Sequence, residues 1–200
     1  MPFGGGTSNG YSNRMIDVAL KEWDLTINAL LAGSQVVLLR KGGILESDNQ
    51  FELEHRRFLF FPTFVHQDPR MVKPAFRAGL TQIRAEPEKV TLKGYGEVAR
   101  ILEVPSRRQL EALDDLHVWD APLLDMRFAY RPEKPLYLVV VRACVLPEPV
   151  TIENTLEYAG CKSWVPLAEA IDESAGVPAM EQERFGQILT RIENTLAAKT

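Results

Sequence analysis

Two basic residues and two glycines, Arg40-Lys41-Gly42-Gly43, directly follow the first apolar run of the chain. The run itself, residues 35–39, is rich in Val and Leu, which predicts a short buried strand. Glycine lets a ligand approach the backbone closely and the two cations attract anions, so this strand exit has the chemistry to bind a phosphate or a carboxylate. The alternative is a hairpin turn whose charges lie in water. Because Arg40 adjoins the apolar run, we expect it to be partly buried.

Carboxylates and imidazoles gather a little further along the chain. Glu52, Glu54 and His55 precede a predicted strand at residues 58–61, and His66 follows that strand. Such groups ligate metals or act as an acid and a base. In one continuous strand, however, Glu52 and Glu54 would share a face and His55 would lie on the other. The competing interpretation is a charged edge strand that resists unwanted pairing. Since no compact ligand triad is visible, we predict no metal ion and no other cofactor.

A third cluster is Gly160-Cys161-Lys162-Ser163-Trp164. A Cys beside a Lys is a candidate nucleophile, and a Trp beside a Lys can stack on a nucleobase. No His adjoins Cys161, and strand alternation places Cys161 and Lys162 on opposite faces. Core packing of Cys161 and Trp164 is therefore the favoured interpretation.

The longest apolar run, residues 136–146, predicts a central strand covered on both faces and ended by Pro147 and Pro149. It contains one charge, Arg142. A buried charge needs a partner, so we expect either that Asp125 or Glu54 neutralises Arg142 or that Arg142 faces a ligand pocket.

Hydrophobic periodicity supplies the other elements that must position these residues. Apolar side chains recur every three or four residues over 16–32 and over 180–198, which predicts a helix at each end of the domain. Strands are predicted near 90–104 and 160–167, a short helix at 106–113 and a weak helix at 72–85. Residues 1–14, rich in Gly, Ser and Asn, predict a disordered arm, and residues 15–200 a single domain. Without a regular βαβ rhythm, the fold class is α+β: a small, mixed, strongly curved sheet or barrel flanked by N- and C-terminal helices.

Composition narrows the function classes. Of 200 residues, 23 are Lys or Arg and 27 are Asp or Glu, a net charge of −4, so no broad basic surface attracts nucleic acid and any such binding must be local. The motifs typical of dinucleotide-binding, P-loop, zincin and α/β-hydrolase proteins are absent. No apolar run is long enough to cross a bilayer and no signal peptide is apparent, so we expect a cytoplasmic protein with no membrane partner.

The chain resembles an uncharacterised bacterial family, common in cyanobacteria and described only as a domain of unknown function. The stretches that carry this resemblance are Ala19-Leu20-Lys21-Glu22-Trp23, Leu39-Arg40-Lys41-Gly42-Gly43-Ile44, Phe58-Leu59-Phe60-Phe61-Pro62-Thr63 with His66-Gln67, and Gly160-Cys161-Lys162-Ser163-Trp164-Val165. The order of helix, glycine and charged strand end more distantly resembles the PUA-like barrels, including ASCH and EVE domains. That resemblance implies RNA or a modified base as a ligand.

Taken together, the cations and amides at strand exits predict a nucleic-acid- or nucleotide-binding module with a small anion pocket. The proposed ligand contacts are Arg40, Lys41, Arg57, His66, Gln67, Lys162 and Trp164. Two alternatives remain open. One is a metal-dependent hydrolase or nuclease that uses Glu52, Glu54 and His55, and the other is a non-catalytic adaptor or structural protein. The sequence does not define the oligomeric state.

Overall fold

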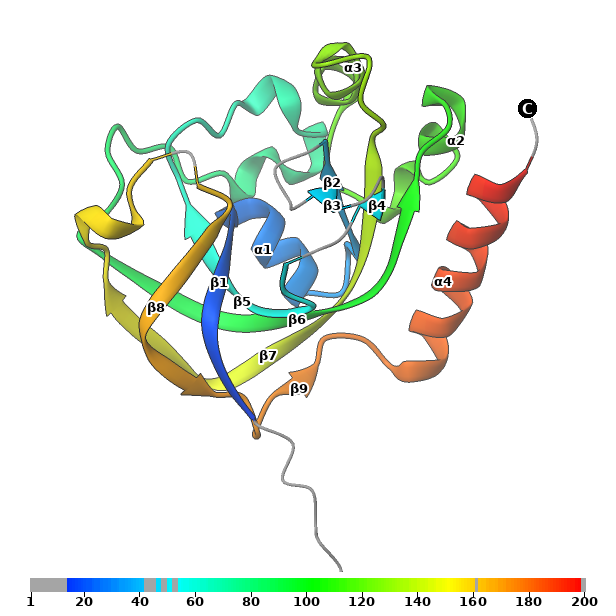
Figure 1. Cartoon of the computed structure of the whole chain (residues 1–200). Helices are drawn as coiled ribbons and strands as arrows, with labels where there is room; N and C mark the ends of the chain where they lie inside the picture. Colours follow the sequence, from blue (N-terminus) through cyan, green and yellow to red (C-terminus); the bar gives the residue numbers. More distant parts are fainter. Residues whose placement is uncertain (1–13, 42–45, 48–49, 52–53, 161, 199–200) are drawn as a thin grey trace, which may run out of the picture.

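The structure is a computed structural model that describes residues 14–41, 46–47, 50–51, 54–160 and 162–198 (Figure 1). The predicted arm at residues 1–14 lies outside this range except for Arg14, and so do Gly42, Gly43, Glu52 and Cys161 of the predicted clusters. No helix in the described ranges is both long enough and apolar enough to cross a membrane.

A mixed sheet forms the body of the described chain, with its strands in the order β2-β7-β6-β5-β1-β8 and β9 paired to β7. Strands β1 and β5 run parallel, and the other neighbouring strands are antiparallel. The strands are β1 (Met15–Trp23), β2 (Val37–Arg40), β5 (Arg57–Thr63), β6 (Lys89–Glu103), β7 (Tyr137–Glu153), β8 (Trp164–Asp172) and β9 (Val177–Pro178), beside a separate pair β3 (Glu46–Ser47) and β4 (Gln50–Phe51).

The helices cover both sides of this sheet. Helix α1 lies inside the curve of the sheet, whereas α4 lies along its outside (Figure 1). The α-helices are α1 (Asp24–Leu31), α2 (Arg107–Glu111), α3 (Ala121–Ala129) and α4 (Gln182–Ala197), and short 3₁₀ turns occur at η1 (Pro69–Met71), η2 (Pro74–Gly79), η3 (Asp114–Leu116) and η4 (Leu156–Tyr158).

The predicted α+β fold with a strongly curved mixed sheet is confirmed. The sheet stays open, with β2 and β8 as its two ends, so of the two predicted forms the curved sheet is correct and the closed barrel is not. Strong curvature arises where β6 and β7 shift register, between Leu92 and Gly94 and between Val98 and Arg100.

The predicted helix at residues 16–32 is wrong in its first half. Residues up to Trp23 form β1, and only Asp24 to Leu31 are helical. The apolar residues Ile16, Val18 and Leu20 fit the alternating pattern of a strand as well as the apolar stripe of a helix. Strand β1 is paired on both sides, with β5 and with β8. These ladders outweigh the local preference of the chain.

Other boundaries also differ from the predictions. Strand β7 continues through Pro147 and Pro149 to Glu153. The weak helix predicted at 72–85 is reduced to the 3₁₀ turn η2, and α3 was not predicted.

The hydrophobic core has two parts on opposite sides of the sheet. One part packs α1 side chains such as Ile27 and Leu30 against Phe58, Phe60 and other strand residues. The second packs the apolar stripe of α4, including Phe185 and Ile192, with α2 and α3. The predicted C-terminal amphipathic helix is therefore confirmed, and its apolar stripe is the face that it buries.

Gly94→Ala is expected to lower the free energy of unfolding by about 2 kcal/mol, because overpacking a filled core costs about 1–3 kcal/mol. A Cβ at this position would meet the carbonyl oxygen of Cys144 and lie 2.5 Å from the Leu31 Cδ2 atom. The matched control is Gly186→Ala on α4, where a Cβ meets nothing within 4 Å. The helix preference of alanine should stabilise this control by up to about 1 kcal/mol. Equal urea midpoints for the two variants would contradict the packing at Gly94.

Candidate anion-binding site

Arg40 ends the short buried strand β2, and its side chain contacts a carboxylate on a different strand. Val37 to Leu39 are buried, and Arg40 pairs through its backbone with Tyr137 of β7. The Nη2 atom of Arg40 forms an ion pair with the Oε1 atom of Glu22 on β1, and the two side chains are 13% and 11% exposed. Arg40 is therefore partly buried, as predicted, and it lies beside a carboxylate that was not among the predicted site residues.

A second guanidinium, that of Arg127 on α3, completes the cluster. Burial lowers the pKa of Arg127, the nearby Arg40 charge lowers it further, and Glu22 acts in the opposite direction. Two like charges therefore share one carboxylate in a region shielded from water. Such an arrangement favours the entry of another anion.

Three nitrogen positions in this cluster lack a hydrogen-bond acceptor among the described residues. They are the Nε and Nη2 atoms of Arg40 and the Nε atom of Arg127, all of them buried. Of these, Arg40 Nη2 already contacts the Glu22 carboxylate in an ion pair, so the two Nε atoms are the donors that have no partner among the described residues. A buried donor without an acceptor costs about 1–3 kcal/mol, so an oxygen ligand that accepts from these groups would gain that energy.

Arg40 and Arg127 both line a cavity of about 70 Å³. Its lining residues come from β1, β2, α3 and the segment before α3: Glu22, Trp23, Leu39, Arg40, Trp119, Leu123, Met126 and Arg127. Among these lining residues, Met126 has an exposed side chain. We refer to this feature as the Arg40–Arg127 cavity.

Lys41 does not line the cavity but binds the end of helix α3. Its Nζ atom donates hydrogen bonds to the carbonyl oxygens of Arg127 at 3.0 Å and Phe128 at 2.9 Å, and the residue is 8% exposed. A cation at the last carbonyls of a helix stabilises the end of that helix. Lys41 thus fixes the turn of α3 that carries Arg127. The adjacent residues Arg40 and Lys41 therefore have different environments, one facing the cavity and one holding α3.

The predicted contacts on β5 and in the following loop lie elsewhere. Arg57 forms an ion pair of 2.7 Å with the buried Glu173. The Gln67 side chain accepts a hydrogen bond from the Leu25 N–H at 3.3 Å and donates to the carbonyl oxygens of Phe64 and Thr81, so it holds the start of α1. His66 is exposed and lines an open hollow that shares no residue with the Arg40–Arg127 cavity.

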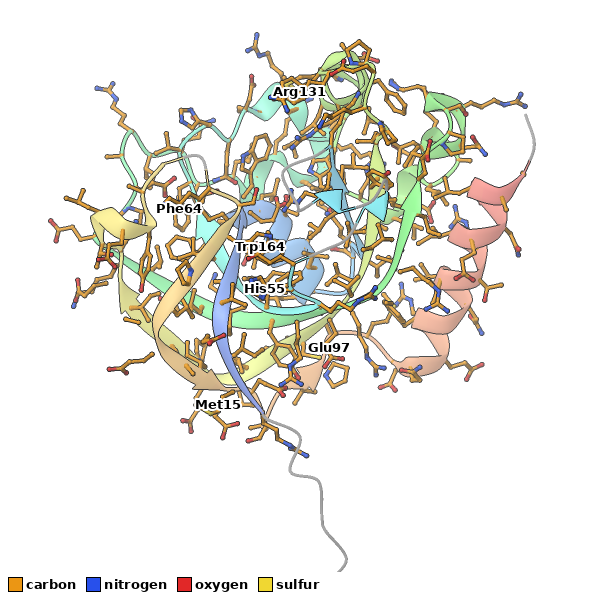
Figure 2. The ribbon with its side chains drawn as sticks, in the orientation of Figure 1. Met15, His55, Phe64, Glu97, Arg131 and Trp164 are labelled. Carbon is orange, nitrogen blue, oxygen red and sulfur yellow. The ribbon has the colours of Figure 1, made fainter. Side chains whose placement is uncertain are left out.

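Trp164 and His55 lie side by side, next to β1 in the view of Figure 2. The Trp164 ring makes edge contacts with His55 at 5.1 Å and Phe58 at 5.2 Å between ring centroids. Trp164 pairs through its backbone with Leu20, two residues before Glu22, so Trp164 and Arg40 flank the same stretch of β1. Lys162 is exposed to solvent.

For the hydrolase alternative, the structure describes Glu54 and His55 but not Glu52. The His55 Nε2 and Glu54 Oε1 atoms are 3.6 Å apart. No group of three or more His, Cys, Asp or Glu side chains in the described ranges has metal-binding geometry.

The prediction that Asp125 or Glu54 neutralises Arg142 is wrong. Its guanidinium bonds to the Gln182 side chain at the start of α4. Asp125 pairs instead with Arg107 at 2.8 Å, and Glu54 with His55. Arg142 sits half-buried at a surface contact, so water and a neutral amide are enough to satisfy it.

Sequence reasoning missed Glu22 and Arg127. One signal for Arg127 was available, because it stands four residues after Leu123 and so on the same side of a helix as a buried leucine. Using that signal requires the helix α3 to be recognised first.

The comparisons agree with the resemblance found in the sequence. Residues 19–191 match the family model described as "Domain of unknown function (DUF1802)". No curated protein matches the chain. Among solved structures, ASCH from Zymomonas mobilis is 10% identical, with a TM-score of 0.44, over 87% of this chain and 93% of that chain. Two point mutants of the same ASCH protein are each 9% identical, with TM-scores of 0.42 (87% of this chain and 94% of that chain) and 0.44 (86% and 96%). With the family model spanning residues 19–191, the chain belongs to the DUF1802 family of domains of unknown function.

Proposed function

We propose that the protein binds nucleic acid or a nucleotide and holds an anionic group of that ligand in the Arg40–Arg127 cavity. The observation that carries the proposal is the set of buried guanidinium nitrogens, on Arg40 and Arg127, that have no hydrogen-bond acceptor among the described residues. Arg guanidinium groups match phosphate oxygens in geometry and charge. Trp23 lines the cavity and is only partly buried, so its ring can also offer an aromatic surface to a base that stays outside the cavity.

The other predicted contacts keep roles in this proposal that suit their positions. Lys41 positions α3, and Trp164 flanks β1 beside the site. Lys162 and His66 are exposed, so we assign them contacts with parts of the ligand that lie outside the cavity. Arg57 and Gln67 are engaged within the fold, so we assign them support of the strands and of α1 rather than first contact with the ligand.

A net charge of −4 limits how many phosphates such a protein neutralises. With one or two phosphates held at a local site, the logarithm of the binding constant should fall with the logarithm of salt concentration with a slope of about −1 to −2. A broad basic surface would give a much steeper slope.

The proposal is tested by fluorescence anisotropy with labelled single-stranded RNA and DNA, and by competition with nucleotides, at low salt. Arg40→Gln and Arg127→Gln should each weaken binding about tenfold or more, because a charge-assisted hydrogen bond contributes about 1.5–3 kcal/mol. The matched control is Arg108→Gln, which removes an equal charge from the exposed face of α2.

The three variants should also be compared by thermal unfolding, so that weaker binding is not confused with loss of the fold. Because Arg40→Gln leaves Glu22 without its partner, the double variant Arg40→Gln/Glu22→Gln restores the neutrality of this pair, and it should still bind more weakly than the wild-type protein. The proposal fails if the wild-type protein binds none of these ligands. It fails equally if Arg127→Gln and Arg40→Gln bind as well as Arg108→Gln.

A further inference from the structure

Resting on the proposed function, we infer that the Arg40–Arg127 cavity selects a terminal phosphate, the phosphomonoester end of a nucleotide or oligonucleotide, and that Glu22 is the counter-ion with which this phosphate competes. The inference concerns which part of the ligand enters the cavity. It follows from the size of the cavity, its charge and the placement of Glu22.

The cavity is too small for a base or a sugar. At about 70 Å³ it has room for a few atoms of the size of a water molecule, because about 10–15 Å³ of such space is enough to hold one water. A phosphate group meets that limit. An internal phosphodiester would have to bring in its two flanking sugars, for which the lining residues Trp23, Trp119 and Leu123 leave no room.

The charges around the cavity match a dianion. Arg40 and Arg127 line the cavity and Lys41 lies behind it, against the single lining carboxylate of Glu22, which leaves a net charge of +2. A phosphomonoester carries a charge of about −1.5 to −2 at pH 7, whereas each internal phosphodiester carries only −1. The terminal phosphate therefore comes closer to neutralising this buried region.

Glu22 competes with the ligand because its carboxylate already pairs with the Arg40 guanidinium. Its carboxylate contacts Arg40 Nη2, and its backbone carbonyl oxygen accepts a hydrogen bond from the Thr63 hydroxyl at 2.9 Å, which ties this part of β1 to β5. The backbone that carries Glu22 is thus fixed, and the carboxylate beside Arg40 repels an incoming anion at short range. Replacing it with the neutral Gln keeps an acceptor for Arg40 and removes that repulsion.

The experiment compares oligonucleotides of one sequence that carry a 5′-phosphate, a 3′-phosphate or only hydroxyl ends, with inorganic phosphate as a competitor. The wild-type protein should bind at least one phosphorylated form about tenfold more tightly than the hydroxyl form. Inorganic phosphate should reduce that preference. Trp23 and Trp119 line the cavity, so intrinsic fluorescence provides a second readout in the unlabelled protein.

Two variants give opposite expected results. Arg127→Gln should lower the preference for the phosphorylated end to about twofold or less, while Glu22→Gln should strengthen binding of the phosphorylated form about threefold or more. Glu22→Gln leaves two buried guanidinium groups without a carboxylate, so its thermal midpoint should fall and should recover with added phosphate more than that of the wild-type protein. Arg108→Gln should leave all of these values unchanged.

The outcomes separate the two proposals. If all three oligonucleotides bind equally and Arg40→Gln weakens them alike, recognition of the end group is wrong while nucleic-acid binding at the site stands. If none of them binds, the proposed function itself is wrong. A weaker affinity of Glu22→Gln for the phosphorylated form, in a folded protein, would overturn the role of Glu22 as a competing counter-ion.

Discussion

Replacing Arg57 with methionine is expected to lower the free energy of unfolding by about 3 kcal/mol, because removing one partner of a buried ion pair leaves the other charge uncompensated. Glu173 is only 7% exposed, and its Oε1 atom is 2.7 Å from the Arg57 Nη2 atom. The Tyr95 hydroxyl also hydrogen-bonds to Glu173, and burial together with this bond raises the pKa of Tyr95. Methionine retains the apolar part of the arginine stem but offers Glu173 no charge.

Urea denaturation at pH 7 measures this loss, and a double-mutant cycle identifies its cause. In Arg57→Met/Glu173→Gln the uncompensated charge is gone, so the double variant should be more stable than Arg57→Met alone. The cycle also distinguishes the two roles considered for Arg57. If Arg57→Met unfolds at the wild-type urea midpoint while nucleic-acid binding weakens, Arg57 is a ligand contact, as the sequence predicts, and its pair with Glu173 is unimportant to the fold.

Acid is expected to destabilise the protein through His117. This residue is 1% exposed, and neither of its ring nitrogens has a hydrogen-bond partner among the described residues. The pKa of His117 is lowered from 6.5 to about 4, mainly by burial and also by the nearby Lys73 ammonium, against smaller opposing effects of Asp114, Asp115 and the Trp119 backbone. The folded state therefore keeps the imidazole neutral where the unfolded chain would protonate it.

The direction of the pH effect follows from this difference. The unfolded state binds the extra proton between about pH 6.5 and pH 4, so the contribution is complete above pH 6.5 and is lost as the pH falls towards 4. Since each pKa unit corresponds to about 1.4 kcal/mol, the loss from His117 approaches about 3 kcal/mol. Urea midpoints measured at intervals from pH 7.5 to pH 4.5 record it.

The matched variant is His117→Phe. His117 stacks on Trp119 with ring centroids 5.3 Å apart, and phenylalanine keeps that contact without a titratable group. The variant should lose clearly less stability than the wild-type protein over the same pH interval. Parallel pH profiles for the two proteins would show that other groups cause the acid sensitivity.

Local sequence patterns predict the segments whose burial is the same along their whole length, either on both faces or on one face. Residues 136–146 are almost entirely apolar because β7 is covered there on both faces, and α4 carries one stripe because it covers one face of the sheet. Strand β1 escapes such prediction, because its structure depends on pairing with β5 and β8, which are distant in sequence. Strand β7 tolerates Pro147 and Pro149 because residues 146–149 fall in the register shift opposite β6, where a missing N–H breaks no ladder bond.

The candidate site likewise contains one residue that local sequence patterns predict and others that depend on distant segments. Arg40 could be identified because it ends an apolar run within a few residues of sequence. Its partners Glu22 and Arg127 come from β1 and α3, and only the folded chain brings the three side chains together. Lys41 shows the limit of reasoning from residue type, since its charge is as suitable for a phosphate as that of Arg40 but is directed at the last carbonyls of α3.

The position of β1 in the sheet bears on how the chain folds during synthesis. Although β1 is the first strand, it lies between β5 and β8, and Met15 pairs with Asp172. Contacts between segments so far apart in sequence form slowly, because a long loop must close before they contribute any stability. The ribosome must therefore release most of the chain before both edges of β1 are paired, and until then one edge of an apolar strand stays open to other chains, which makes this interval the most sensitive to aggregation.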